Sequence, residues 1–168
     1  MKYSIVYSSP TGNTQQLAQA IARRLPAEEC LYNGPVDEKA LEAPVLFVGF
    51  WTDKGSCDAK VAQLLAQAQG KQVYLFGTAG FGKEQEYFQQ ILARVAQNAP
   101  EGVVTGSGFM CQGRMPQAVR SRYEACMEKE PKEPRWPMLI ENFDAALSHP
   151  DMEDEQAAAQ WAANCLGL

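Results

Sequence analysis

The sequence predicts an α/β protein: a three-layer α/β/α sandwich in which helices cover both faces of a five-stranded parallel sheet. Short apolar runs without polar alternation, such as residues 45–50, are typical of strands that are buried on both faces. These runs alternate along the chain with longer segments in which apolar residues recur at helical spacing. A chain of 168 residues can bury one sizeable core, so we expect a single domain over residues 1–168.

The strand candidates are apolar runs bounded by turn residues. The second candidate ends at Asn33-Gly34-Pro35, and the fifth contains Gly106 and Gly108, which weaken it as a strand. A glycine-rich loop, residues 77–82, follows the fourth. The five candidates are residues 3–7, 28–32, 45–50, 72–76 and 103–111.

The helix candidates combine apolar residues at helical spacing with capping signals at their ends. Asp58 and Asp151 stand where an N-cap is expected, and Pro116 suits the first position of a helix. Residues 37–42 form a turn or short helix, whereas residues 128–137, with three prolines and mixed charges, are expected to form a surface connection without a helix. The helix candidates are residues 13–25, 58–70, 83–97, 116–127, 138–147 and 152–166.

The turn between the first strand and the first helix is suited to binding a phosphate group. The helix start leaves backbone N–H groups without partners and carries the positive end of the peptide dipoles. Hydroxyl groups add donors around it, and Gly12 lets the backbone come close to a ligand, so the turn would surround a dianionic phosphate without lysine or arginine. The alternative is an ordinary helix cap with a proline-containing turn. The residues assigned to this turn are Ser8, Ser9, Pro10, Thr11, Gly12, Asn13 and Thr14.

Two other phosphate-binding loops are excluded. The ATP/GTP loop requires Gly-x-x-x-x-Gly-Lys followed by Ser or Thr, and the chain contains no such string. The dinucleotide-binding loop requires three spaced glycines at the start of the first helix, where Gly12 stands alone.

Two further loops are expected at the same edge of the sheet, because ligands bind beyond the carboxyl ends of parallel strands. Trp51 ends the third strand, and Phe81 lies between two glycines in the loop after the fourth. Aromatic residues in polar loops are poor core candidates, but a flat ring held between two of them gains contact area and stacking energy. The pair favours a flat aromatic ligand, with packing of Trp51 at the sheet edge as the alternative. The residues assigned to these loops are Trp51, Thr52, Lys54, Gly55, Thr78, Ala79, Gly80 and Phe81.

The spacing Ser9-Pro10-Thr11-Gly12-Asn13-Thr14, directly after the first strand, resembles the phosphate loop of the flavodoxin family. The resemblance extends through the aromatic loops to Gly113 and implies the strand order 2-1-3-4-5, which is flavodoxin's own. It also implies an FMN cofactor, with its phosphate in the turn and its ring between Trp51 and Phe81. A tyrosine commonly covers the outer face of the ring in flavodoxins, and Phe81 is the nearest counterpart here.

Three short motifs are similar to a small flavodoxin-like branch associated with bilirubin reductase. They are Lys54-Gly55, Cys111-Gln112-Gly113 and His149-Pro150-Asp151. One position departs from the best-known family pattern: Thr52 stands where many flavodoxins have a glycine whose peptide turns towards the reduced flavin. The resemblance therefore does not carry that interaction over to this chain.

Composition limits the partners and the compartment. The formal net charge of −5 argues against nucleic acid, and the absence of a long apolar run or a signal peptide argues against membrane insertion and for a cytoplasmic location. The five cysteines form no Cys-x-x-Cys pair, which favours reduced thiols and indicates no metal site. Residues 124–155 hold ten carboxylates, which would either steer a basic protein partner or form a solvated acidic face.

Three functions remain open. An FMN-dependent electron carrier that shuttles electrons to or from a reductase partner is favoured, because only residues 128–150 are spare for a substrate pocket and their composition suits a surface feature. The alternatives are an FMN-dependent oxidoreductase acting directly on a small molecule such as a quinone, and a flavin-free module for another phosphate ligand. No acid–base or nucleophilic constellation identifies a catalytic residue, and His149, the sole histidine, is interpreted as part of a turn.

Overall fold

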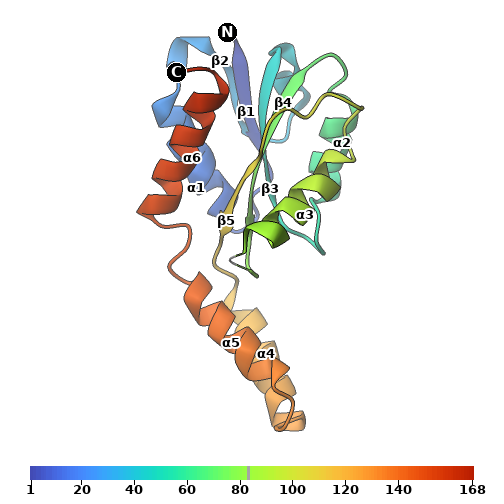
Figure 1. Cartoon of the computed structure of the whole chain (residues 1–168), viewed down its shortest axis with the longest axis vertical. Coiled ribbons are helices and arrows are strands. Elements are labelled where there is room, and N and C mark those ends of the chain that lie inside the picture. Colours follow the sequence, from blue (N-terminus) through green and yellow to red (C-terminus); the bar gives the residue numbers. More distant parts are fainter. Residues whose placement is uncertain (83) are drawn as a thin grey trace.

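A five-stranded sheet forms the centre of the computed structural model, which describes residues 1–82 and 84–168 (Figure 1). All neighbouring strands are parallel and their order is 2-1-3-4-5, which confirms the expected architecture. The strands are β1 (Tyr3–Tyr7), β2 (Cys30–Pro35), β3 (Val45–Trp51), β4 (Gln72–Ala79) and β5 (Phe109–Gln112).

Helices cover both faces of this sheet. One face packs against α1 (Asn13–Arg24) and α6 (Met152–Cys165), and the other against α2 (Ala59–Ala66) and α3 (Gln85–Ala96) (Figure 1). Two buried apolar clusters, one on each face, account for the apolar runs of the central strands. Two short 3-10 helices, η1 (Ala27–Glu29) and η2 (Glu38–Glu42), flank β2.

Several boundaries differ from the sequence prediction. β5 starts only at Phe109, because Gly106 adopts a positive φ of 66° and leaves Val104 with an isolated bridge to Val73. β2 includes Pro35, which a strand at the edge of the sheet tolerates because no neighbour needs its missing N–H. Lys83, where the sequence predicts that a helix begins, lies outside the described residues.

A helical hairpin extends beyond the carboxyl end of the sheet (Figure 1). It consists of α4 (Gln117–Lys129) and α5 (Arg135–Ala146), and it joins β5 to α6. The helices predicted over residues 116–127 and 138–147 are both present, but the prediction that residues 128–137 contain no helix is wrong at both ends, because α4 extends to Lys129 and α5 starts at Arg135. Pro134 caps α5 and Pro137 falls in its first turn, where a missing N–H removes no intrahelical bond.

The two helices of this hairpin contact each other largely through side chains at the surface. Arg120 on α4 donates to both carboxylate oxygens of Asp144 on α5, at 2.9 and 3.0 Å, and also pairs with Glu124. The ring centroids of Tyr123 and Trp136 lie 6.4 Å apart across the hairpin. Every residue of α4 keeps part of its surface exposed, so the hairpin adds little to the core.

Candidate functional site

A cavity of about 530 Å³ opens at the carboxyl end of the sheet, within the size range of small-molecule pockets. It is bordered by the three loops that the sequence predicts to converge there. Eleven of the fifteen predicted residues line it: Pro10, Thr11 and Asn13 after β1, Trp51, Thr52, Lys54 and Gly55 after β3, and Thr78, Ala79, Gly80 and Phe81 at the end of β4.

A fourth wall of the cavity was not predicted from sequence. The chain after β5 lies beyond the carboxyl end of the sheet (Figure 1) and lines the cavity with Gly113, Arg114, Met115 and Pro116, followed by Val119 of α4. The chain passes so close to Asn13 that position 113 requires glycine, because a Cβ there would lie 2.6 Å from the side-chain nitrogen of Asn13. The glycine directly after the fifth strand was the available signal, but only the loops after strands 1, 3 and 4 were expected at the site.

The backbone at the start of α1 offers unpaired donors. Gly12 takes a positive φ of 88°, which turns the chain into the helix. Within the described residues, the backbone N–H groups of Asn13 and Thr14 have no hydrogen-bond acceptor. The next N–H, that of Gln15, donates to the hydroxyl of Ser9 at 3.0 Å. Two adjacent amides at a helix N-terminus therefore remain available for an anion.

Two side chains of the turn have roles other than the predicted ones. The Thr14 hydroxyl is buried between the Phe50 carbonyl and the Thr78 hydroxyl, each at 3.0 Å, so it ties α1 to the sheet instead of facing a ligand. The amide nitrogen of Asn13 donates to the carbonyl of Arg114 at 2.8 Å. Its amide oxygen is buried without a partner in the described residues, although Asn13 as a whole lines the cavity.

Ser8 and Ser9 lie on the other side of the turn. With Pro10 they line a smaller hollow of about 320 Å³, to which Lys60 of α2 also belongs. A phosphate site without lysine or arginine was expected from sequence, whereas the structure adds Lys60 to the hollow that these serines line.

Asp58 connects the turn after β1 to the aromatic loop after β3. Its carboxylate accepts from the Ser8 hydroxyl at 2.5 Å and from the Trp51 indole N–H at 3.0 Å, and it caps α2 through the N–H of Val61. Burial by itself would raise the pKa of Asp58, but these three hydrogen bonds hold that pKa below its usual value. Of these contacts, only the capping role of Asp58 could be predicted from sequence.

We expect Asp58→Asn to lower the free energy of unfolding by about 1 kcal/mol at neutral pH, because asparagine still caps a helix but loses the charge-assisted bonds. The stabilisation by Asp58 is present above its ordinary pKa of 3.8 and is lost as the pH falls through the lower pKa of the folded protein. Urea unfolding at a pH of about 7 and of about 3 measures both proteins. A difference that stays constant with pH would contradict this role.

The loop after β3 is held in place by backbone hydrogen bonds. The N–H and the hydroxyl of Thr52 both donate to the Thr78 carbonyl, at 2.9 and 2.8 Å. Lys54 and Gly55 follow with φ of 51° and 82°, as in the two-residue turn of a hairpin. The Gly55 carbonyl accepts from Arg94 of α3 at 3.2 Å. The Thr78 and Gly55 carbonyls are therefore already paired, and so are the backbone N–H groups of Thr52, Asp53 and Ser56.

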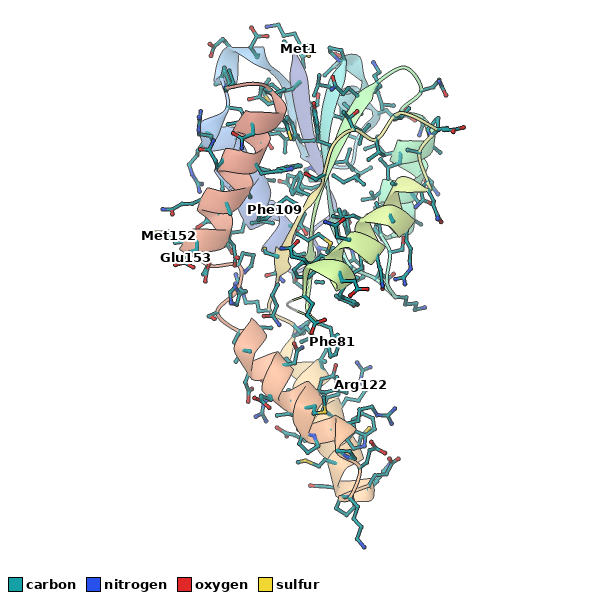
Figure 2. The ribbon with its side chains drawn as sticks, in the orientation of Figure 1. Met1, Phe81, Phe109, Arg122, Met152 and Glu153 are labelled. Carbon is teal, nitrogen blue, oxygen red and sulfur yellow. The ribbon has the colours of Figure 1, made fainter. Side chains whose placement is uncertain are left out.

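Phe81 is the most accessible aromatic side chain at the site, with 49% of its surface exposed. The ring of Tyr87 packs edge-on against it, with 6.0 Å between the ring centroids. Figure 2 shows Phe81 below the sheet, at the base of the helical hairpin. Trp51 and Phe81 thus contribute two aromatic surfaces to one cavity, as the sequence predicts.

The five cysteines are free thiols. Burial raises the pKa of the Cys57 and Cys111 thiols, which disfavours reactive thiolates. His149 contacts Asp154 at 2.6 Å, and Asp154 forms a reciprocal capping box with Asp151 at the start of α6.

Among the described residues, no helix is both long and apolar enough to cross a membrane.

Comparisons with known proteins agree with this architecture. The family model described as "Flavodoxin domain" matches residues 4–163. The chain is 42% identical to the flavodoxin-like domain-containing protein BilS of Clostridium symbiosum (strain WAL-14163), over 94% of this chain and 92% of the relative. It is 27% identical to the BilS protein of Clostridioides difficile (strain CD3), over 99% and 97% of the two chains.

Solved structures show the same fold at lower identity. A flavodoxin from the domain Archaea superposes with a TM-score of 0.55 at 18% identity, over 98% of this chain and 95% of that chain. Oxidised Flavodoxin 2 from Bacillus cereus superposes with a TM-score of 0.54 at 16% identity, over 96% and 95%.

Proposed function

Since this chain belongs to the flavodoxin domain family, we propose that it binds FMN in the cavity at the carboxyl end of the sheet and exchanges electrons with a reductase or oxidoreductase partner. Members of the flavodoxin family bind FMN. The observation that carries the proposal is that the start of α1, with its two unpaired amides, meets two aromatic side chains at one cavity, which Asn13, Trp51 and Phe81 line. Donors suited to a phosphate and surfaces suited to a flat ring are both required by FMN.

The residues present fit the cofactor. The N–H groups of Asn13 and Thr14 would bind the phosphate, together with the hydroxyl of Thr11, which lies at the surface of the cavity. The unpartnered oxygen of Asn13 would accept from a hydroxyl or N–H group of the cofactor. Trp51 and Phe81 would contact the two faces of the ring.

When bound, FMN supplies the redox chemistry, while the protein orients it and sets its surroundings. The hydrogen bond from the Trp51 indole N–H to Asp58 fixes the plane of this indole ring before the ligand binds. The pairing of Thr52 with the Thr78 carbonyl holds the neighbouring loop. Fixing both loops in advance reduces the entropy that binding would otherwise cost.

One observation favours the second candidate, an FMN-dependent oxidoreductase acting on a small molecule. From their composition, residues 128–150 were expected to form a surface feature rather than a pocket wall. In the structure, α5 forms one wall of a groove of about 810 Å³ that shares Phe81 and Tyr87 with the cavity. That premise is therefore wrong, and the choice between carrier and enzyme needs an experiment.

The experiment is an absorbance spectrum of the purified protein, followed by anaerobic reduction with dithionite. Flavin bands are expected, either as purified or after addition of FMN. Reoxidation by a partner protein but not by small quinones would support the carrier, and direct turnover of quinones would support the enzyme. A colourless protein that ignores added FMN would overturn both flavin functions and leave a module for another phosphate ligand.

Thr11→Ala tests the phosphate end of the site. We expect it to weaken FMN binding about tenfold, because one hydrogen bond to a charged group contributes about 1.4 kcal/mol. Thr11→Ser, which keeps the hydroxyl, is the matched control and should bind within a factor of about 2 of the natural chain. Titration followed by flavin fluorescence measures both variants, and equal affinity of the alanine and serine variants would contradict the assignment.

A further inference from the structure

The groove between α3 and α5 is larger than the proposed cofactor cavity and lies directly beside it. Its volume is about 810 Å³, and Phe81 and Tyr87 border both spaces. One wall comes from the loop after β4 and the start of α3, and the other from α5. A molecule bound in the groove would therefore touch the same aromatic side chains that face the cofactor cavity.

Hydrogen bonds fix α5 against the loop after β4. The Asn142 side chain donates to the Gly80 carbonyl at 2.9 Å and accepts from the Gln112 amide at 3.1 Å. Gln112, on β5, is almost fully buried. The groove is consequently formed in advance, although the hairpin carries little core of its own.

The groove exposes apolar side chains. Met138 and Phe81 keep 67% and 49% of their surface exposed, and Leu139 and Ala145 of α5 also line the groove. Exposed apolar surface that is rimmed by polar residues marks interaction sites in soluble proteins. The side chains are spread along a helix face and an adjacent loop, which suits an extended protein surface better than a small enclosed ligand.

The rim of the groove is acidic. Glu84, Glu133 and Glu141 line it, while Arg135 is the one cation lining it among the described residues. The guanidinium of Arg135 lies 4.4 Å from the centre of its neighbouring indole, Trp136, which occupies one face of that cation. The rim therefore favours positive charge on a partner.

We propose that this groove is the docking site of the redox partner, and that the partner presents an apolar side chain flanked by lysine or arginine. The proposal rests on the proposed function and adds the place and the chemistry of the contact. Apolar contact with Met138 and Phe81 would supply binding energy, and the carboxylates would select and orient the basic flank. Docking there would bring the partner to the side chain that borders the cofactor cavity.

The test uses the isotope-labelled full chain, with and without FMN, and the acetylated and amidated peptide Lys-Lys-Phe-Leu-Lys-Lys as probe. Two-dimensional NMR is expected to show saturable shifts at Met138, Leu139 and Ala145. Met138→Ser should weaken the peptide about fivefold or more, as loss of an apolar anchor does. Met152→Ser is the matched control, because Met152 is 70% exposed and lies at the lower end of α6, away from the groove (Figure 2).

The outcomes separate this proposal from the proposed function. Peptide binding at the groove without any FMN binding would overturn the function and support the groove. FMN binding with peptide shifts confined to Glu153 and Glu155 of α6, or with equal binding of the acidic peptide Glu-Glu-Phe-Leu-Glu-Glu, would overturn the groove. Saturable filling by naphthalene with no response to the basic peptide would also overturn it and identify a small-molecule site.

Discussion

Trp51→Ala is expected to weaken FMN binding about 100-fold. An aromatic side chain buries roughly 150–250 Å², and one face of the Trp51 indole, about 100 Å², would be covered by the flavin ring. At ~25 cal/mol per Å² this contact contributes about 2.5 kcal/mol, close to the ~2.7 kcal/mol of a 100-fold change. The variant also removes the N–H that donates to Asp58 and so loosens the loop.

Two variants make this measurement specific. Trp51→Phe keeps a ring but loses the hydrogen bond to Asp58, so its loss should stay within about tenfold. Trp136→Ala removes an indole from the hairpin and should leave FMN affinity unchanged, since Trp136 does not line the cavity. Titration followed by flavin fluorescence compares the FMN affinity of Trp51→Ala, Trp51→Phe and Trp136→Ala, and circular dichroism checks that each variant is folded. Binding by Trp51→Ala as tight as that of the natural chain would refute the predicted stacking role.

The sheet and the position of the site could be predicted because each depends on local signals. Apolar runs such as residues 45–50 indicate buried parallel strands, and parallel strands place their following loops at one edge. Pro10, Trp51 and Phe81 could be assigned to one cavity for that reason alone. The strand order came from the flavodoxin resemblance, and the structure confirms it.

Side-chain roles at the site could not be predicted in the same way, because they depend on contacts between distant residues. Thr14 has the hydroxyl expected of a phosphate ligand, but the carbonyl of Phe50 and the hydroxyl of Thr78 lie within its reach. The sequence predicts only that Asp58 caps a helix. In the structure Oδ1 of Asp58 makes the cap, and Oδ2 accepts from Ser8 and Trp51. Such pairings span up to 64 residues and leave no periodic pattern in the chain.

Both helices of the hairpin were predicted, but their connection was placed over residues 128–137, where the structure has the end of α4 and the first turn of α5. Three prolines between residues 128 and 137 suggested a connection, since proline usually interrupts helices. Their positions matter more than their number, because Pro134 and Pro137 fall at the start of α5. The groove beside Phe81 could not be predicted, because it depends on the long-range contact that holds α5 against the loop after β4.

Gly49→Ala is expected to lower the free energy of unfolding by about 3 kcal/mol, the upper range for an added group in a packed core. Gly49 on β3 lies opposite Phe76 on β4, and a Cβ there would be 2.5 Å from Cζ of the Phe76 ring. It would also be 2.9 Å from Cγ2 of Thr14, whose hydroxyl ties α1 to the sheet. Both neighbours are fully buried, so neither can move without disturbing the core.

Urea unfolding of a double-mutant cycle tests this account of Gly49. Phe76→Leu shortens the side chain that the new methyl group would meet, so the double variant Gly49→Ala/Phe76→Leu should be more stable than the sum of the single changes predicts, by about 1 kcal/mol or more. Strict additivity would show that the methyl group clashes elsewhere. Because the other contact is Thr14, Gly49→Ala is also expected to weaken FMN binding in the fraction that remains folded, whereas Phe76→Leu alone should not. Gly49 therefore links the packing of the central strands to the helix start that offers its amides to the phosphate.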